Sequence, residues 1–283
     1  MKPMVKYRGG KTRELPHILP HVPKGFDRYV EPFLGGGAVF FSLTPGRSVL
    51  NDLNEPLMGF YRAVRDDFTV LRMELDDLES RYRSNRAQFE RAKLANPDEK
   101  VYDPNETLYY RIRDMYNGLT PADYSPAALY FFINKTSYSG MIRHNKEGHF
   151  NVPYGRYKNF NTQLVSKAHS DLLQQASLHQ GDYENVFELC RPNDFVFLDP
   201  PYDSKFSDYG NASTRDGFLE SDHRRLANAF FELPAKALMV IGKSDLISEL
   251  YGDHVFSTYR KQYAVNIRNR FQAENEHFLI KNY

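Results

Sequence analysis

The chain has 283 residues, 41% of them hydrophobic and 26% charged, which is typical of a globular protein with one large domain or two ordinary ones. This composition excludes a disordered chain, and the single cysteine, Cys190, excludes an internal disulfide and a zinc site built from several thiolates. No apolar run reaches the ~18–20 residues that span a membrane, and the first residues lack the apolar stretch of a secretory signal. We therefore expect a cytoplasmic protein with no membrane partner.

Charge is distributed unevenly along a chain whose net charge is only +1. Residues 66–106 carry eleven acidic and seven basic side chains, whereas residues 134–158 carry five basic and one acidic, a net charge of +4. A second basic stretch contains Arg260, Lys261, Arg268 and Arg270. Blocks of one sign are typical of surfaces that contact phosphate, although an exposed solvated face has the same pattern. We favour nucleic acid as the partner.

The first predicted elements are a strand, a turn, a helix and a second strand. Residues 26–31 are a short β-prone run, three glycines follow at 35–37, an apolar helix starts at 38–41, and residues 48–52 form a buried strand ending in an acid. Two β units joined by a helix predict an α/β fold with a doubly wound, mostly parallel sheet.

The middle of the chain has helical periodicity, and the β/α alternation returns after it. Apolar residues keep helical spacing over 70–89 and 106–116, and Ser125-Pro126 has the pattern of an N-cap that opens a helix over 127–134. Later elements are predicted as strands at 194–198, 237–241 and 277–280 and a helix at 220–233. The fold class is therefore α/β, with a mostly helical insertion at 59–163 that divides the sheet domain into 1–58 and 164–283.

The glycine turn is the first candidate binding site. Glycines between a strand and a helix let a ligand approach the backbone closely, and Asp52 follows the last of them by 15 residues, at the end of the next strand. Nucleotide-binding α/β folds place a ribose-binding carboxylate at about this point. An ordinary tight turn would explain the glycines alone. With Asp52, the pattern favours a nucleoside-like ligand.

The strongest motif is Asp199-Pro200-Pro201-Tyr202, directly after a predicted buried strand. Ligands bind at the carboxyl ends of parallel strands, and two prolines fix the direction of the residues on either side. A carboxylate beside an aromatic ring suits a planar base with an exocyclic amine, because the acid accepts its N–H hydrogens while the ring stacks on it. A plain proline turn would need neither flanking residue.

These motifs resemble those of the DNA adenine methylase family, S-adenosyl-L-methionine-dependent enzymes that methylate N6 of adenine. The resemblance covers essentially the whole chain, and its motifs stand in the family's order. They are KYRGGK (6–11), EPFLGGGAVFF (31–41), NDLN (51–54), NVPYGRYKN (151–159), GDY (181–183), FLDPPY (197–202) and the terminal FLIKNY.

The resemblance implies roles for particular residues. Asp199, Pro200, Pro201 and Tyr202 would be catalytic and would hold the target adenine. The residues implied to surround S-adenosyl-L-methionine are Tyr7, Lys11, Phe33, Gly35, Gly36, Gly37, Asp52, Asp182, Tyr183 and Asp199. Within that set, Asp52 would bind the ribose, and Asp182 and Tyr183 would hold the adenine of the donor.

Double-stranded DNA is the implied partner, and residues 134–154 would be a β-hairpin that enters it. The residues implied to contact DNA are Lys6, Lys135, Tyr138, Ser139, Met141, Arg143, Asn145, Lys146, Pro153, Arg156 and Lys158. Ser139 and Met141 replace the asparagine and leucine usual in the family, so the target, GATC in most members, stays open. The chain also reads GKSD after Ile241, where a Ser/Asn-rich run is usual.

The implied reaction needs positioning and base flipping, and no metal or obligatory protein partner. Two other classes remain as alternatives. A metal-dependent nuclease could use Asp194, Asp203 and Lys205, but it leaves the prolines, Tyr202 and the glycines unexplained. A non-catalytic DNA-binding protein would keep the basic segment without needing Asp199. The lack of a multi-cysteine zinc motif excludes a base deaminase.

Overall fold

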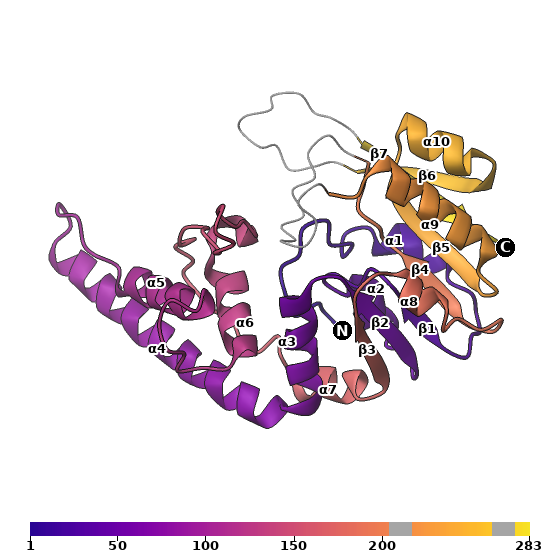
Figure 1. Ribbon diagram of the computed structural model, residues 1–283. Helices are drawn as coiled ribbons and strands as arrows, with labels where there is room; N and C mark the ends of the chain where they lie inside the picture. The colour runs from indigo at the N-terminus through magenta and orange to yellow at the C-terminus, as the bar shows by residue number, and fades with distance from the viewer. Residues whose placement is uncertain (204–216, 262–274) are drawn as a thin grey trace.

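The computed structural model describes residues 1–203, 217–261 and 275–283, and it contains a seven-stranded sheet, on the right in Figure 1. The strands are β1 (Tyr29–Glu31), β2 (Ser48–Asp52), β3 (Ala176–Gln180), β4 (Phe195–Leu198), β5 (Lys236–Gly242), β6 (Val255–Lys261) and β7 (Asn275–Lys281). Their spatial order is β3-β2-β1-β4-β5-β7-β6. The first five in this order are parallel, and β7 is antiparallel to β5 and β6. The expected doubly wound, mostly parallel sheet is confirmed.

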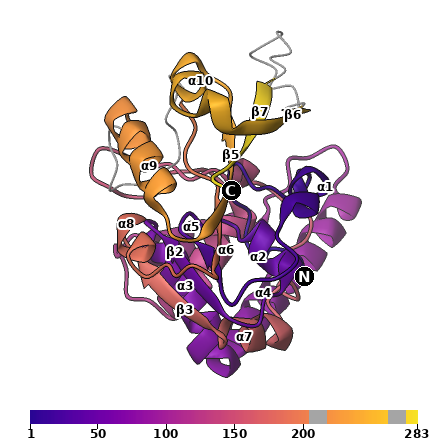
Figure 2. The same cartoon turned by 90° about the vertical axis from the view of Figure 1, so that its right-hand side faces the viewer.

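Helices cover both faces of the sheet. They are α1 (Leu15–Ile18), α2 (Ala38–Leu43), α7 (Lys167–Leu173), α8 (Glu184–Phe187), α9 (Glu220–Glu232) and α10 (Asp245–Tyr251), with the 3-10 turns η1 (Leu19–His21) and η3 (Gly252–His254). Alternate residues of β4 supply the two cores: Phe195 and Phe197 belong to the core with α2 and α7, and Val196 and Leu198 to the core with α8, α9 and α10. Figure 2 shows α8, α9 and α10 together on one side of β5.

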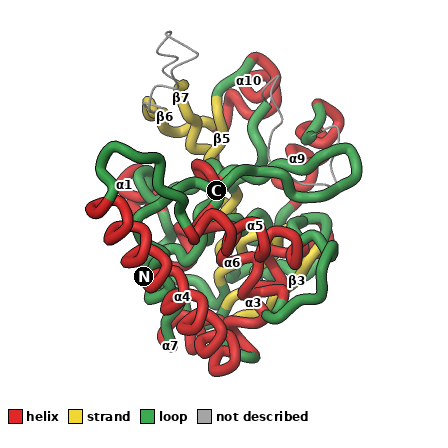
Figure 3. Tube along the Cα trace, turned by 90° about the vertical axis from the view of Figure 1, so that its left-hand side faces the viewer, coloured by secondary structure: helices red, strands yellow, loops and turns green. Residues whose placement is uncertain are grey.

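A helical arm is inserted in the chain between β2 and β3, which are neighbours in the sheet. It consists of α3 (Glu55–Asp66), α4 (Phe68–Ala95), α5 (Pro104–Tyr116), α6 (Pro126–Thr136) and the 3-10 turn η2 (Tyr138–Gly140), and Figure 3 shows these helices in front of the sheet. The predicted N-cap is confirmed, because the Ser125 hydroxyl accepts a hydrogen bond from the backbone N–H of Ala128 at 3.3 Å. One apolar core runs from the sheet into the arm and includes Phe41, Phe60 and Phe131.

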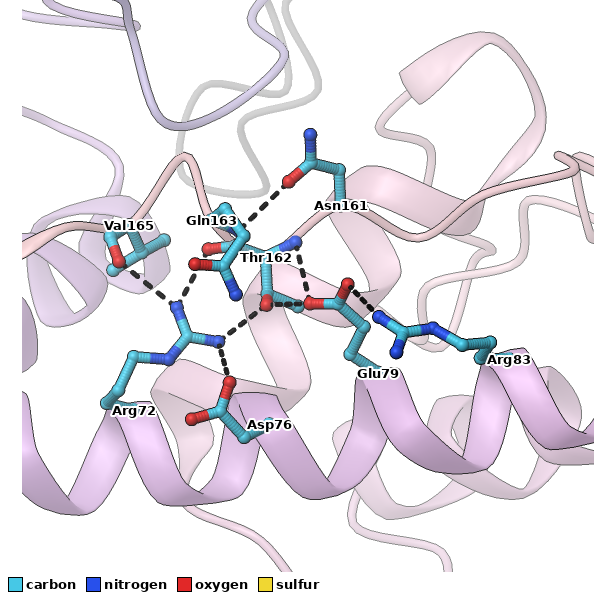
Figure 4. Close-up of polar contacts among 8 residues, drawn as sticks. All are labelled: Arg72, Asp76, Glu79, Arg83, Asn161, Thr162, Gln163 and Val165. Atoms are coloured by element: carbon cyan, nitrogen blue, oxygen red, sulfur yellow. Dashed lines mark hydrogen bonds and ion pairs between the residues drawn. The ribbon is translucent and has the colours of Figure 1, made fainter.

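A polar cluster holds the chain where it leaves the arm (Figure 4). Arg72 of α4 donates hydrogen bonds to the carbonyl oxygens of Thr162 and Val165, at 2.8 and 3.1 Å, and forms an ion pair with Asp76 at 2.9 Å. The buried Thr162 hydroxyl accepts a further bond from Arg72 at 2.5 Å and donates one to Glu79. These contacts fix the arm to the segment that leads back to α7 and β3.

Among the described helices, none combines the length and apolarity needed to cross a membrane.

Candidate active site

A cavity of about 430 Å³ lies at the carboxyl ends of β1, β2, β3 and β4. The strand order reverses at β1 and β4, and such a switch point is where open α/β sheets bind ligands. The loops after all four strands line the cavity, as do residues 7–11, residues 217–218 and part of the hairpin segment at 142–148. The structure therefore brings the predicted cofactor residues, the Asp199–Tyr202 motif and one end of the hairpin segment to a single hollow.

The glycine turn is shaped by close packing against the protein's own rings. Gly35 and Gly37 have φ angles of 47° and 66°, in the left-handed region that favours glycine. A Cβ atom on Gly35 would lie 2.9 Å from the Tyr7 ring, and one on Gly37 would lie 2.8 Å from the Phe41 ring. The Tyr61 hydroxyl also donates a hydrogen bond to the Gly35 carbonyl at 2.9 Å. The positive φ angles and the two ring contacts together favour glycine at both positions, without any ligand.

Asp52 is buried at the end of β2 and joins the turn to the next loop. Its Oδ2 accepts a hydrogen bond from the backbone N–H of Gly35 at 2.8 Å, and its Oδ1 accepts one from Asn54 at 2.9 Å. Burial raises the pKa of Asp52, although hydrogen bonds from the backbone of Asn54, Gly35 and Leu53 oppose that rise. Each carboxylate oxygen accepts about two hydrogen bonds, so Asp52 keeps acceptor capacity at the cavity.

Asp182 and Tyr183 follow β3 on the other side of the cavity. The Asp182 side chain is 44% exposed and pairs with Arg225 of α9 at 2.8 Å. The Tyr183 ring is buried, with its centroid 5.3 Å from that of Phe33. Phe33 lines the cavity beside Tyr183, so the two rings form one apolar wall. Sequence reasoning missed Arg225, because nothing in the helix pattern of residues 220–233 marks it.

Lys11 lies against the Asp199–Tyr202 motif. Its buried ammonium is 2.7 Å from Asp199 Oδ2, donates to the Gly9 carbonyl at 2.8 Å and lies 5.0 Å from the centroid of the Tyr202 ring. A Cβ atom on Gly242, at the end of β5, would lie 3.1 Å from Tyr202. The glycine of the unusual GKSD run therefore leaves room for the Tyr202 ring.

Glu31 is a second buried acid at the cavity, at the end of β1. The Tyr29 hydroxyl donates a hydrogen bond to it at 2.8 Å. Burial raises the pKa of Glu31 well above its ordinary value, and the charges of Asp199 and Asp52 raise it further. The hydrogen bond from Tyr29 lowers this pKa but does not cancel the rise. Glu31 was not predicted as a site residue, although it ends a strand as Asp52 does, which is a signal in the sequence.

The predicted hairpin (residues 134–154) agrees with the structure only in part, because residues 134–136 are the end of α6 and residues 138–140 form η2. Antiparallel pairing in this hairpin segment occurs as two isolated bridges, between Ser137 and Tyr154 and between His144 and Phe150. The backbone N–H of Tyr138 donates to the Pro153 carbonyl at 2.9 Å. Tyr138, Ser139 and Met141 are exposed, Tyr138 by 55% and Met141 by 43%. The hairpin segment therefore exposes these three side chains to solvent, and few backbone hydrogen bonds join its two halves.

Arg143 and Asn145 of the hairpin segment both line the cavity. Arg143 donates from Nε to Asn151 Oδ1 at 2.8 Å and from Nη2 to the Asn151 carbonyl at 3.2 Å. Asn145 Oδ1 accepts hydrogen bonds from the backbone N–H groups of Glu147 and His149, at 3.1 and 2.8 Å. The Asn145 side chain therefore stabilises the turn at the tip of the hairpin segment. Arg143 is held by Asn151 on the opposite side of that turn.

Lys6 joins the N-terminal segment to the arm. Its backbone exchanges two hydrogen bonds with the Asn134 side chain, at 2.8 and 2.7 Å. Its ammonium donates to the Lys135 carbonyl at 3.0 Å and lies 3.8 Å from the centroid of the Tyr157 ring. Burial, and then the charge of Lys6, lowers the pKa of Lys135 to about 8.

The remaining predicted DNA contacts lie on the surface. Lys146, Arg156 and Lys158 are exposed, and Arg156 forms an ion pair with Glu106 at 3.4 Å. Arg268 and Arg270 of the second basic stretch lie outside the described residues.

The structure separates the acids of the nuclease alternative. Asp194 precedes β4, is buried and pairs with Arg28 at 2.6 Å, whereas Asp203 follows the other end of the same strand. Lys205 lies outside the described residues. Within the part of the chain that the structure describes, no cluster of three or more His, Cys, Asp or Glu side chains is arranged to hold a metal ion.

Comparisons with known proteins agree with each other. The sequence profile of the D12 class N6 adenine-specific DNA methyltransferases matches residues 7–267. The chain is 34% identical over 291 residues to the type II methyltransferase M.CviBI of Paramecium bursaria Chlorella virus NC1A, covering all of both proteins. It is 35% identical over 274 residues to the type II methyltransferase M.MjaIII of Methanocaldococcus jannaschii, covering 89% of this chain and 88% of that protein. The retron Ec67 DNA adenine methylase of Escherichia coli is 30% identical over 256 residues, which is 89% of this chain and 81% of that protein.

Proposed function

Since this chain belongs to the D12 class of N6 adenine-specific DNA methyltransferases, we propose that its methyl donor is S-adenosyl-L-methionine and that its target adenine is flipped out of duplex DNA. We further propose a target within GATC or a related short site. The observation that carries the proposal is that Asp52 and the Asp199–Tyr202 motif line one and the same cavity. Its volume of about 430 Å³ is within the ~300–1,000 Å³ of small-molecule sites.

The donor set around the glycine turn fits S-adenosyl-L-methionine. Asp52 would accept hydrogen bonds from the ribose hydroxyls and Asp182 from the amine of the donor's adenine. Phe33 and Tyr183 supply an apolar wall for that adenine, although Tyr183 is buried enough that Phe33 offers the larger accessible face.

The other end of the cavity would hold the target base. The Asp199 carboxylate and the Pro200 carbonyl would accept the two N6 hydrogens, and Tyr202 would stack on the ring. Lys11 holds Asp199 from one side at 2.7 Å, so the carboxylate is oriented before the base arrives. Accepting both hydrogens favours a tetrahedral nitrogen whose lone pair is free to react.

The donor supplies an activated methyl group on a cationic sulfur. Asp199 would take the proton that N6 loses as it is methylated and release it to solvent. The protein's contribution is alignment of the two partners and exclusion of water. Stacking on Tyr202 would offset part of the few kcal/mol that flipping a base costs.

We propose that residues 59–163 recognise the target, and that residues 1–58 and 164–283 form a cytoplasmic catalytic domain that needs no metal and no obligatory protein partner. Support comes from the hairpin segment, because its exposed side chains at 138–141 adjoin a tip that lines the cavity. DNA read by this segment would thus lie close to Asp199. The relatives named DNA adenine methylase support adenine in DNA as the target.

Transfer of labelled methyl tests the proposal directly. Purified protein is incubated with radiolabelled S-adenosyl-L-methionine, a chelator and duplexes that contain or lack GATC. We expect label in N6-methyladenine in duplex DNA without added metal. Absence of transfer to any DNA, or magnesium-dependent cleavage of a plasmid in its place, would overturn the proposal.

A further inference from the structure

We propose that Arg225 is a positioning residue for the methyl donor: it fixes the Asp182 carboxylate in the orientation that recognises the donor's adenine. This inference rests on the proposed function, because it assumes that S-adenosyl-L-methionine occupies the cavity. Arg225 lines that cavity from α9, the first described helix after the Asp199–Tyr202 motif.

Arg225 grips Asp182 with two parallel hydrogen bonds. Nη1 donates to Oδ1 at 3.1 Å and Nη2 donates to Oδ2 at 2.8 Å, the fork geometry in which arginine holds a carboxylate in one plane. The guanidinium carbon also lies 4.7 Å from the centroid of the Tyr183 ring, so it covers the residue next to Asp182 as well. The Arg225 side chain therefore contacts both residues that are predicted to hold the donor's adenine, Asp182 and Tyr183.

The hydrogen bonds determine which oxygen of Asp182 remains for a ligand. Oδ1 accepts from Arg225 and from the backbone N–H of Glu184 at 3.0 Å, which fills its usual capacity. Oδ2 accepts only from Arg225 among the described residues and keeps a lone pair. Because the two oxygens of a carboxylate are chemically equivalent, Arg225 fixes the plane of the carboxylate and therefore the direction of the remaining lone pair.

Charge supports the same role. Burial alone would raise the pKa of Asp182, but hydrogen bonds from Arg225 and Glu184, together with the Arg225 charge, hold this pKa below its ordinary value. Asp182 is therefore an ionised acceptor at neutral pH. Glu184 and Asp222 also lie near the guanidinium, at 3.0 and 3.8 Å. Because the Arg225 and Asp182 side chains are 38% and 44% exposed, solvent screens the pair, and its main effect is orientation rather than stability.

The neighbouring arginine provides a matched control. Arg224 has the same chemistry on the same helix, but it pairs with Glu220 and with Glu249 of α10, each at 2.8 Å, and it does not line the cavity. A change in net charge or in helix stability would affect both positions similarly.

The test compares the affinities of Arg225→Gln, Arg225→Lys, Arg224→Gln and the unchanged protein for two ligands by calorimetry. S-adenosylhomocysteine has an amine that donates to Asp182, whereas S-inosylhomocysteine has a carbonyl oxygen there. We expect Arg225→Gln to weaken S-adenosylhomocysteine binding about tenfold and to reduce the preference over the inosine ligand. Arg225→Lys should restore part of that preference, and Arg224→Gln should leave both affinities within about twofold. In methyl transfer, the KM for the donor should rise in Arg225→Gln while kcat stays within about threefold.

Three results separate the inference from the proposed function. If the unchanged protein binds S-adenosylhomocysteine and Arg225→Gln keeps the full preference for it, the inference is wrong and the proposed function stands. If Arg225→Gln loses affinity for both ligands equally, the residue only supports the loop, and the inference is again wrong. If the unchanged protein does not bind S-adenosylhomocysteine, the proposed function fails and the inference fails with it.

Discussion

The two sides of the cavity are built differently. On the sheet side, Asp52 is buried and both its oxygens accept backbone hydrogen bonds, while Gly35 and Gly37 are packed against rings. On the hairpin side, Tyr138 and Met141 are exposed, and antiparallel pairing occurs at only two places. The first side is set by contacts that exist without a ligand, whereas the second presents side chains that have few contacts to hold them.

This difference indicates where specificity is set. A site that binds the same small molecule in every cycle gains from being ordered in advance, because less entropy is lost on binding. A segment that must first find and then enter DNA gains from adaptable side chains. We therefore expect substitutions on the sheet side to reduce turnover or donor affinity, and substitutions on the hairpin side to change which duplex is methylated.

The largest effect is expected at Asp199. Asp199→Ala should lower methyl transfer by at least ~10²-fold, since it removes the acceptor that aligns N6, and should leave S-adenosylhomocysteine affinity within a few-fold. Asp199→Asn should also be severely impaired, because its amide offers a donor where an acceptor is needed. Turnover under saturating donor and DNA measures both variants, and near-normal turnover in either would remove Asp199 from the reaction.

Asp52→Ala should instead weaken binding of the donor. A hydrogen bond from a ribose hydroxyl to a carboxylate is worth ~1.5–3 kcal/mol, or about 10- to 150-fold in affinity. The backbone N–H groups of Gly35 and Asn54 would also lose their acceptor, so the free energy of unfolding should fall by ~1–3 kcal/mol. Calorimetry and denaturant titration measure the two effects separately, and unchanged affinity in the folded variant would exclude Asp52 from the donor site.

Arg143→Ala tests the hairpin side. In the free protein Arg143 is bonded to Asn151, and we expect it to exchange these bonds for a guanine edge on DNA. Loss of a base-reading arginine should reduce discrimination between the cognate duplex and single-base variants by ~1–3 kcal/mol. Asn151→Ala removes the side-chain acceptor that Arg143 has in the free protein and keeps the carbonyl acceptor, and it should leave this discrimination unchanged. Equal slowing of every duplex by Arg143→Ala would show that Arg143 binds phosphate only.

The smallest effect is expected at Lys135, which we predict to contact phosphate. With its pKa lowered to about 8, this lysine is charged below that pH and neutral above it, so its phosphate contact should be lost as pH rises from 7 to 9. Salt titrations of DNA binding should show a slope smaller by about one at pH 9 than at pH 7. Lys135→Arg should have the same salt slope at pH 9 as at pH 7, because arginine stays charged. If the slope of the unchanged protein were also the same at pH 7 and pH 9, Lys135 would not contact phosphate.

The sequence predicted the elements that are buried on both faces. Residues 48–52 are the bounds of β2, and β4 and β5 differ from their predicted ranges by one residue at the ends, because each is a continuous apolar run. The outer strands β3 and β6 were not predicted, since polar residues alternate along a strand that is partly exposed. Motifs also marked the loops after β1, β2 and β4, because glycines follow the first strand, an acid ends the second, and Asp199-Pro200-Pro201-Tyr202 follows the third.

The contacts across the site could not be predicted in the same way. The pairs Lys11–Asp199 and Arg225–Asp182 join residues on separate loops and helices, and local periodicity contains no information on which of them meet. The tight packing of Tyr7 on Gly35 is of the same kind. The glycines of the turn were predicted from the close approach of a ligand. The structure adds a second reason for glycine, which is the packing of Tyr7 and Phe41 against the turn.

The central claim, that one cavity aligns a methyl donor with a flipped adenine, is tested most directly by sequencing methylated DNA. Long-read sequencing is applied to DNA from cells that lack other adenine methylases and express either the unchanged protein or Asp199→Ala. We predict N6-methyladenine at one short recurring site with the unchanged protein and none with Asp199→Ala at equal protein level. Absence of N6-methyladenine with the unchanged, folded protein, or equal methylation by Asp199→Ala, would contradict the account.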